Sequence, residues 1–178
     1  MKVLVLTGSP HTHGATALLT QEFIRGAEEA GHEVTRIDTA TLQIHPCIAC
    51  EQCHHTDKGC VFKEDDMQKV TPYLLHADAV IFITPVYYYA ITAQLKAVID
   101  RFYANDELLH CDKKAALLLA YADTEDKTAD GPATSFANMT EFLEWENLGV
   151  IAAKGCADRD DIEITDYPQK AYELGKSL

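Results

Sequence analysis

Positive charge is scarce in this chain, in which 15 lysines and arginines stand against 28 aspartates and glutamates for a formal net charge of −13. Such a surface repels phosphate-rich polymers and anionic lipids, so we expect neither a nucleic-acid nor a membrane partner. Long apolar runs are also missing: the best stretch, residues 79–91, is broken by Pro85 and three tyrosines and is too short to cross a bilayer. An apolar strand begins at residue 2, where a secretory leader would stand, and we therefore expect a cytoplasmic location.

The first loop lacks two common phosphate-binding motifs. The apolar run 3–7 predicts a strand buried on both faces, and residues 8–16 form a small, hydroxyl-rich loop before a periodic helix. This loop has no G-x-G-x-x-G pattern, and no Lys follows Gly14 as a Walker A loop requires. Free backbone N–H groups and a helix N-terminus nevertheless favour an anion. The loop therefore predicts a site for a terminal monophosphate, such as that of FMN.

Linkers, repeats and low-complexity tracts are absent as well, and 178 residues suit a single domain, here residues 1–178. Strands are predicted at 3–7, 32–38, 79–84, 115–121 and 148–153, and helices at 15–30, 66–76 (capped by Asp65), 95–102, 134–146 and 167–177. This alternation predicts an α/β fold, a five-stranded parallel sheet of order 2-1-3-4-5 with helices on both faces. Ligands of such sheets bind beyond the carboxyl ends of the strands, between the first and the third. Loops 8–16 and 85–90 meet there.

The loop at residues 8–16 offers several groups to a phosphate. Ser9 and Thr16 can donate hydroxyl groups, and the backbone N–H groups of residues 11–16 can converge on one anion. Hydrogen bonds to a charged group contribute roughly 1.5–3 kcal/mol each. The alternative is an ordinary strand-to-helix connection in which a Ser or Thr caps the helix. The predicted phosphate-binding residues are Ser9, His11, His13, Gly14, Ala15 and Thr16.

The loop after the third strand is rich in tyrosine. Pro85 ends the strand, and the backbone of residues 86–89 can offer N–H and C=O groups to the pyrimidine edge of a flavin. A tyrosine of this segment can also cover a ring face, where aromatic contacts add about 0.5–1.5 kcal/mol beyond burial. The alternative is that the tyrosines fill the core or an interface. The predicted flavin platform comprises Pro85, Val86, Tyr87 and Tyr88.

Four of the six cysteines lie in one segment. Cys47, Cys50 and Cys53 recur at every third residue, and Cys60 follows after six more. The first three match the compact run of bacterial [4Fe-4S] sites, whereas the fourth spacing is longer and lacks the following Pro. A cytoplasmic location argues against a disulfide framework. The segment therefore predicts either a [4Fe-4S] cluster on these four cysteines or free thiols beside a flavin.

Two other interpretations of this segment are a zinc site and a haem attachment site. Zinc can bind four thiolates, or thiolates together with His54 or His55. Residues 50–54 also match a c-type haem attachment motif, which the missing export signal disfavours. The remaining cysteines, Cys111 and Cys156, stand alone and are predicted to be small buried apolar residues.

Other charged residues are predicted to be structural. Lys96, Asp100 and Arg101 lie at helical spacing and are expected at the helix surface or at an interface. The acidic residues 123–130 are expected to form a solvated loop, as a rim for substrate entry. No Ser/His/Asp or Cys/His order stands at a spacing that indicates hydrolysis.

Several motifs together resemble the flavodoxin-like NAD(P)H-dependent FMN reductase superfamily, in particular its branch close to the iron-sulfur flavoproteins. The matching segments are Gly8-Ser9-Pro10 with Gly14-Ala15-Thr16, the four cysteines leading to Asp65-Asp66-Met67, Thr84-Pro85-Val86-Tyr87 with Gln94-Leu95-Lys96 and Asp100-Arg101, and Ala171-Tyr172-Glu173-Leu174-Gly175-Lys176. The chain departs from this pattern at His11, where an Arg often stands, and at Ala15, where Asn is common. Because His is only partly charged near neutrality, weaker or more pH-dependent phosphate binding follows.

The resemblance implies an FMN-dependent oxidoreductase. It would take hydride from NAD(P)H and reduce a small acceptor, namely a flavin, a quinone, or a nitro or azo compound, or else a redox protein, with the cofactor carrying the chemistry. The resemblance also implies a homodimer or homotetramer. Two alternatives stay open: an electron carrier with FMN and a [4Fe-4S] cluster on residues 47–60, and a non-redox binding domain on the same fold.

Overall fold

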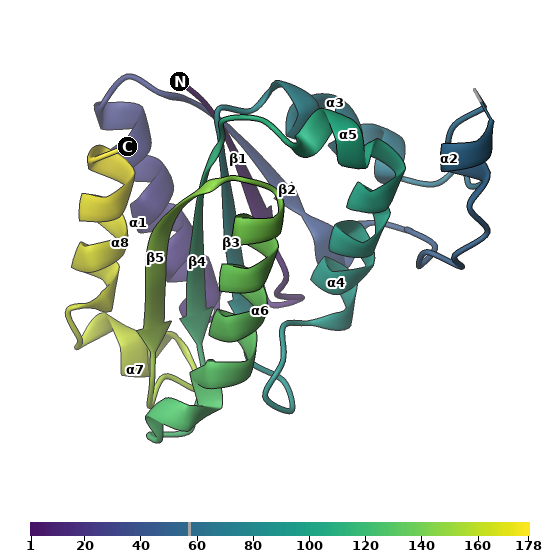
Figure 1. Cartoon of the computed structure of the whole chain (residues 1–178). Coiled ribbons are helices and arrows are strands. Elements are labelled where there is room, and N and C mark those ends of the chain that lie inside the picture. Colours follow the sequence, from purple (N-terminus) through teal and green to yellow (C-terminus); the bar gives the residue numbers. More distant parts are fainter. Residues whose placement is uncertain (57) are drawn as a thin grey trace.

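A computed structural model of the chain describes residues 1–56 and 58–178, and its centre is a parallel sheet. Within these residues five strands lie in the order β2-β1-β3-β4-β5, which confirms the predicted topology (Figure 1). The pairing is parallel, and Val5 of β1 lies between Arg36 of β2 and Ile81 of β3. The strands are β1 (Lys2–Thr7), β2 (Glu33–Asp38), β3 (Ala79–Pro85), β4 (Lys114–Ala120) and β5 (Glu146–Ala153).

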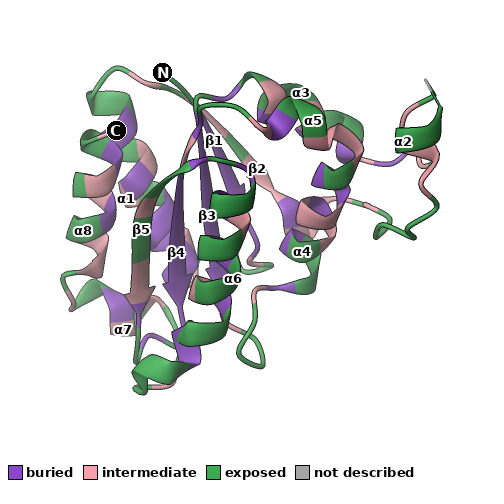
Figure 2. Ribbon diagram, viewed as in Figure 1, coloured by how far each residue is buried: buried purple, intermediate pink, exposed green. Residues whose placement is uncertain are grey.

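Helices cover both faces of the sheet, because side chains of the central strands alternate between two apolar layers. Leu4 and Phe82 belong to the layer packed by α3, α4 and α6, whereas Val5 and Ile81 belong to the layer packed by α1, α7 and α8 (Figures 1 and 2). The first group is α3 (Met67–His76), α4 (Ala93–Asp100) and α6 (Asp130–Phe142). The second group is α1 (Ala15–Glu29), α7 (Arg159–Glu163) and α8 (Tyr167–Lys176).

Short elements connect these helices. Most lie near the carboxyl ends of the strands or in the segment between β2 and α3. They are η1 (Thr39–Thr41), α2 (Gln52–His55), η2 (Arg101–Asn105), α5 (Asp106–Leu109) and η3 (Asp126–Ala129). No helix in the described ranges has the length and apolar character needed to cross a membrane.

The boundaries differ from the sequence prediction at two helices. The structure places α6 at Asp130–Phe142 instead of residues 134–146, because Glu144 takes a left-handed conformation (φ 60°) and reverses the chain before β5 begins. The helix predicted at 95–102 ends at Asp100 and continues as the tighter turns of η2. Neither α2 nor α7 was predicted. In α7 the signal was present, since Asp158 and Asp161 form a capping box at its start.

The segment that carries four cysteines stands apart from this layered body. Its short helix α2 projects beyond α4, away from the sheet (Figure 1). Its residues are exposed or half-buried (Figure 2). Asp57, which belongs to the predicted cysteine-rich connection, lies outside the described residues. We call residues 45–62 the cysteine loop.

Candidate functional site

The first half of the candidate site is the loop after β1, residues 8–16, which we call the phosphate loop. It leads into α1, whose N-terminal residue Gly14 supplies no side-chain hydrogen bond to the helix, and whose first turn has no acidic residue. Ala15 and Thr16 on that turn are buried, with exposed fractions of 5% and 4%. A 15-residue helix that starts without a protein cap leaves positive N–H dipoles for an anion. The start of α1 in the phosphate loop can therefore bind an anion.

Two of the predicted phosphate ligands instead contact each other. The N–H of His11 donates to Ser9 Oγ at 3.1 Å, so this N–H is used within the loop. Thr12 Oγ1 lies 2.9 Å from His13 Nδ1, and both histidines are exposed. The N–H groups at the start of α1 are therefore better placed than that of His11 to bind an anion.

The second half of the site is the loop after β3, and Gly8 brings the two halves together. Gly8 N–H donates to Ile83 O at 2.8 Å, extending the pairing of β1 and β3 into the loops. A Cβ on Gly8 would lie 2.5 Å from Thr92 Oγ1 and 2.7 Å from Thr84 Oγ1. Only glycine lets the phosphate loop pack this closely against the end of β3 and the start of α4. Sequence reasoning gave no role to Thr84 and Thr92.

Beyond Pro85 the chain makes a tight turn, residues 86–90, which we call the tyrosine turn. Tyr87 and Ala90 exchange backbone hydrogen bonds of 2.9 and 3.1 Å, and Tyr88 and Tyr89 have φ values of 49° and 61°. These angles belong to the left-handed region typical of tight hairpin turns. The ring of Tyr88 is fully exposed. The alternative that these tyrosines fill the core is therefore wrong, and the turn presents aromatic surface at the carboxyl end of the sheet.

The tyrosine turn also contacts the element after β4. A Cβ on Gly131, in the first turn of α6, would lie 2.5 Å from Tyr89 O. The tyrosine turn therefore packs closely against the start of α6. Tyr121, directly after β4, is buried, and burial raises the pKa of its hydroxyl. The acidic residues predicted as a loop contain η3, and Thr128 of η3 donates a hydrogen bond to Asp123, which precedes that element.

The four cysteines of the cysteine loop share one small cavity. Cys47, Cys50, Cys53 and Cys60 all line a cavity of about 20 Å³. Burial raises the pKa of the Cys53 thiol, and the neighbouring sulfurs of the other three raise it further. In the described part of the chain, no three His, Cys, Asp or Glu side chains converge closely enough to hold a single metal ion. The cysteines fit the donor set of an iron–sulfur cluster, which spreads its ligands over several irons.

Arg101 holds this loop, and sequence reasoning missed it. The prediction of a surface or interface charge is wrong, because the Arg101 side chain is 3% exposed and pairs with Asp65, which is 2% exposed. Arg101 Nη1 donates to His45 O at 2.9 Å and Nη2 to Phe62 O at 3.2 Å, so one guanidinium binds both ends of the loop. The charges of Lys96 and Asp100 do form an exposed ion pair, as expected.

Asp65 completes the arrangement. Its carboxylate also accepts the N–H groups of His45 and Met67, both at 3.1 Å. Burial would raise the pKa of Asp65, but these hydrogen bonds and that from Arg101 outweigh it and lower the pKa. Asp65, which the sequence predicted as the cap of α3, accepts the N–H of Met67 at the helix start, although the N-cap position itself belongs to Asp66. Asp65 also links the helix start to the cysteine loop and to Arg101.

The two lone cysteines differ from each other. Cys156 is buried, as predicted, and burial raises the pKa of its thiol. Cys111 is exposed, so the prediction of a buried position is wrong there. Cys111 follows α5 at the surface of the protein.

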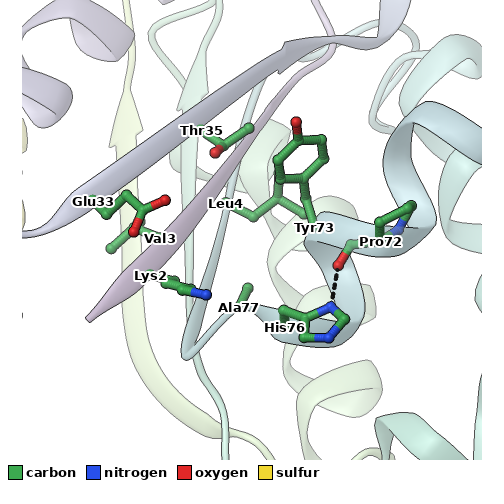
Figure 3. A pocket seen from close by; sticks show the side chains of 9 residues that line it. All are labelled: Lys2, Val3, Leu4, Glu33, Thr35, Pro72, Tyr73, His76 and Ala77. Atoms are coloured by element: carbon green, nitrogen blue, oxygen red, sulfur yellow. Dashed lines mark hydrogen bonds between the residues drawn. The ribbon is translucent and has the colours of Figure 1, made fainter.

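A separate cavity of about 320 Å³ lies at the opposite, amino-terminal end of the strands (Figure 3). Lys2 and Leu4 of β1 face Tyr73 and His76 of α3 across it, and His76 Nδ1 is hydrogen-bonded to Pro72 O. Ligands of open parallel sheets bind at the carboxyl ends of the strands, where this cavity does not lie. It contains none of the residues predicted from the sequence.

Comparison with known proteins decides the family. The chain matches the family model of NADPH-dependent FMN reductase over residues 1–131. It belongs to that family. The match covers β1 to the start of α6 and so contains the phosphate loop, the cysteine loop and the tyrosine turn. The predicted FMN reductase membership is confirmed.

Individual relatives add detail. An iron-sulfur flavoprotein of Methanocaldococcus jannaschii is 36% identical over 101 residues, 57% of this chain and 51% of that protein. An iron-sulfur flavoprotein of Archaeoglobus fulgidus is 34% identical over 101 residues, 57% of this chain and 45% of that protein. The matched part spans about half the length of these relatives. An NAD(P)H:quinone oxidoreductase from Methanothermobacter marburgensis has the same fold, with a TM-score of 0.81 at 19% identity over 100% of this chain and 96% of that one.

Proposed function

We propose that this chain, as one FMN-binding domain, takes hydride from NAD(P)H and reduces a small acceptor such as a flavin, a quinone, or a nitro or azo compound. The observation that carries the proposal is the uncapped start of α1, in a phosphate loop whose Gly8 packs against Thr84 and Thr92, the residues that flank the tyrosine turn. This packing brings a helix start suited to an anion and an exposed aromatic turn to the edge of the sheet where ligands of this fold bind. Membership of the FMN reductase family supports the cofactor.

FMN, when bound, supplies the redox chemistry, and the chain supplies position and access. Gly14, Ala15 and Thr16 would hold the phosphate through their backbone N–H groups. The backbone of Pro85, which ends β3, and of Val86 would hold the flavin ring. Tyr87 and Tyr88 would exclude water from the ring.

The exposed tyrosines also support the proposed homodimer or homotetramer. Tyr88 is fully exposed and Tyr89 is 56% exposed, which leaves two large rings in water beside the site. A second copy of the chain would cover them and enclose the flavin. Light scattering of the FMN-loaded protein measures the assembly, and Tyr88→Ser is expected to shift it toward the monomer.

A double variant tests the phosphate loop. Ser9→Ala together with Thr16→Ala is expected to weaken FMN binding at least tenfold, because it removes two hydroxyl donors beside the phosphate. The measurement is fluorescence quenching of FMN titrated with protein. Thr71→Ala is the control, since Thr71 donates its hydroxyl to Met67 O within α3. Unchanged affinity in the double variant would place the phosphate elsewhere.

The cavity lined by four cysteines favours a second function, an electron carrier with FMN and a [4Fe-4S] cluster. The thiols of Cys47, Cys50, Cys53 and Cys60 would ligate the cluster. Their cavity of about 20 Å³ now holds roughly one water-sized group, so the loop must open between its ends to admit a cluster.

Anaerobically purified protein distinguishes the two functions. Iron and sulfide at about four per chain, with a broad visible band over the flavin spectrum, support the carrier. Flavin bands alone, bleached rapidly by NADPH, support the reductase. Cys50→Ser is expected to abolish the cluster and to leave FMN bound.

A further inference from the structure

Both ends of the cysteine loop are fixed by one buried guanidinium. Nη1 of Arg101 binds His45 O, before the first cysteine, and Nη2 binds Phe62 O, after the last. The rings of His45 and Phe62 stack at 4.6 Å, and the guanidinium lies 5.4 Å from the Phe62 ring. These contacts close the base of the loop without using any cysteine.

The middle of the cysteine loop is held separately, by Tyr103, two residues after Arg101 in η2. The Tyr103 hydroxyl donates to Glu51 Oε2 at 2.8 Å, and His54 Nε2 donates to Tyr103 O at 2.8 Å. These groups are exposed, so their contacts are weak and exchange readily with water. The buried clamp at Arg101 is therefore the stronger attachment, and the cysteines between the ends can rearrange while the ends stay fixed.

Arg101 also belongs to the lining of the cavity that the four cysteines line. Its Nε is buried and finds no acceptor among the residues that the structure describes. A buried donor without an acceptor costs free energy, and a sulfur of an anionic metal–thiolate group is an acceptor of the missing kind.

We propose that Arg101 is a positioning residue for an iron–sulfur cluster on the cysteine loop, which it serves by fixing the two ends of the loop and by offering its buried Nε–H to a cluster sulfur. This inference rests on the second of the two proposed functions. Asp65 compensates the charge of the guanidinium, so the effect on the cluster comes from the hydrogen bond to sulfur, which favours the more negative, reduced form. Arg101 would thus raise the reduction potential of the cluster in addition to aiding its assembly.

Four proteins test this proposal: wild type, Arg101→Lys, the double variant Asp65→Leu with Arg101→Met, and Lys96→Gln. The double variant removes both buried charges together, because removing one alone leaves the other unpaired and risks unfolding. Lys96→Gln is the matched control, which removes a neighbouring cation from an exposed pair on α4. Each protein is loaded anaerobically with iron(II) and sulfide, and its iron content, cluster potential, melting temperature and FMN content are measured.

We expect the double variant to retain FMN and to bind less than half the iron of wild type, with a more negative potential for the cluster that remains. Arg101→Lys keeps the charge that pairs with Asp65 but loses the two-ended clamp and the Nε donor, so it should bind less iron than wild type, with a potential shifted in the same direction as that of the double variant. Lys96→Gln should match wild type. The proposal is overturned if the double variant equals wild type in iron content and potential, or if wild type binds no cluster.

FMN content and NADPH oxidation in the same proteins keep the two proposals separate. A wild type that oxidises NADPH without binding iron refutes the role of Arg101 and leaves the reductase intact. A wild type that binds the cluster but neither FMN nor NADPH refutes the reductase and leaves the role of Arg101 standing.

Discussion

The phosphate loop and the cysteine loop both carry candidate ligands, but the molecule holds them in different ways. The phosphate loop continues β1, and its base is fixed by the backbone hydrogen bond from Gly8 to Ile83 and by contacts with Thr84 and Thr92. The cysteine loop projects from the body and is fixed by side chains, chiefly Arg101 and Asp65. The position of the phosphate loop therefore follows from the sheet, whereas the position of the cysteine loop depends on one buried ion pair.

This difference predicts which substitutions displace each loop. A substitution in the Arg101–Asp65 pair should release the cysteine loop and leave the proposed flavin site in place. A substitution at the base of the phosphate loop should disturb the sheet edge and the proposed flavin site together. The predictions below test this separation, beginning with the largest expected effect.

Asp65→Ala should be the most damaging change. It leaves the Arg101 guanidinium buried without its carboxylate, and breaking a buried pair in this way costs about 3–5 kcal/mol. Urea unfolding measures the loss, and Asp100→Ala, from the exposed pair with Lys96, should cost only about 0–1 kcal/mol. Below the unfolding transition, Asp65→Ala should still bind FMN. Loss of FMN binding by the folded variant would show that the two loops are not independent.

Gly8→Ala should act on the other loop. Its Cβ would lie 2.5 Å from Thr92 Oγ1 and 2.7 Å from Thr84 Oγ1, and overpacking of this kind costs about 1–3 kcal/mol. We expect weaker FMN binding together with lower stability, measured by flavin fluorescence and urea unfolding. In the unfolding experiment Gly14→Ala is the control for sterics, because its Cβ would meet only His11 Cβ, at 3.5 Å, whereas FMN affinity is compared with wild type alone, since Gly14 is itself a proposed phosphate ligand. A stable Gly8→Ala protein with normal FMN affinity would contradict the close packing of the two loops.

The two loops also differ in how much the sequence predicted. Continuous apolar runs predicted β1 and β3, and the order of a parallel sheet then required that the loops after them meet. Nothing local distinguishes Arg101 from Lys96, five residues earlier, because the burial of Arg101 depends on Asp65, 36 residues away. The exposure of Cys111 also depends on tertiary packing, whereas α6 ends early at the left-handed Glu144, a position that no glycine marks in the sequence.

The ion pair should also appear in the pH dependence of stability. The pKa of Asp65 is lowered in the folded protein, so its contribution is complete above the unfolded pKa of about 3.9 and is lost as the pH falls through the lower folded value. The stability difference between wild type and Asp65→Asn, measured by urea unfolding, should therefore be smaller at pH 3 than at pH 7.

The smallest expected effect is a difference in reactivity between two thiols of the cysteine loop. Burial and the neighbouring sulfurs raise the pKa of Cys53, and the thiolate is the reactive form, so Cys53 should react with iodoacetamide several-fold more slowly than Cys47 in metal-free protein at pH 8. Exposed Cys111 serves as the reference for an unhindered thiol, and buried Cys156 should be the slowest. Mass spectrometry of the modified peptides gives each rate. Equal rates for Cys47 and Cys53 would mean that the loop opens freely and that Arg101 fixes only its ends. A slow Cys53 that becomes fast in Asp65→Ala would show that the ion pair at the base also keeps the four sulfurs together.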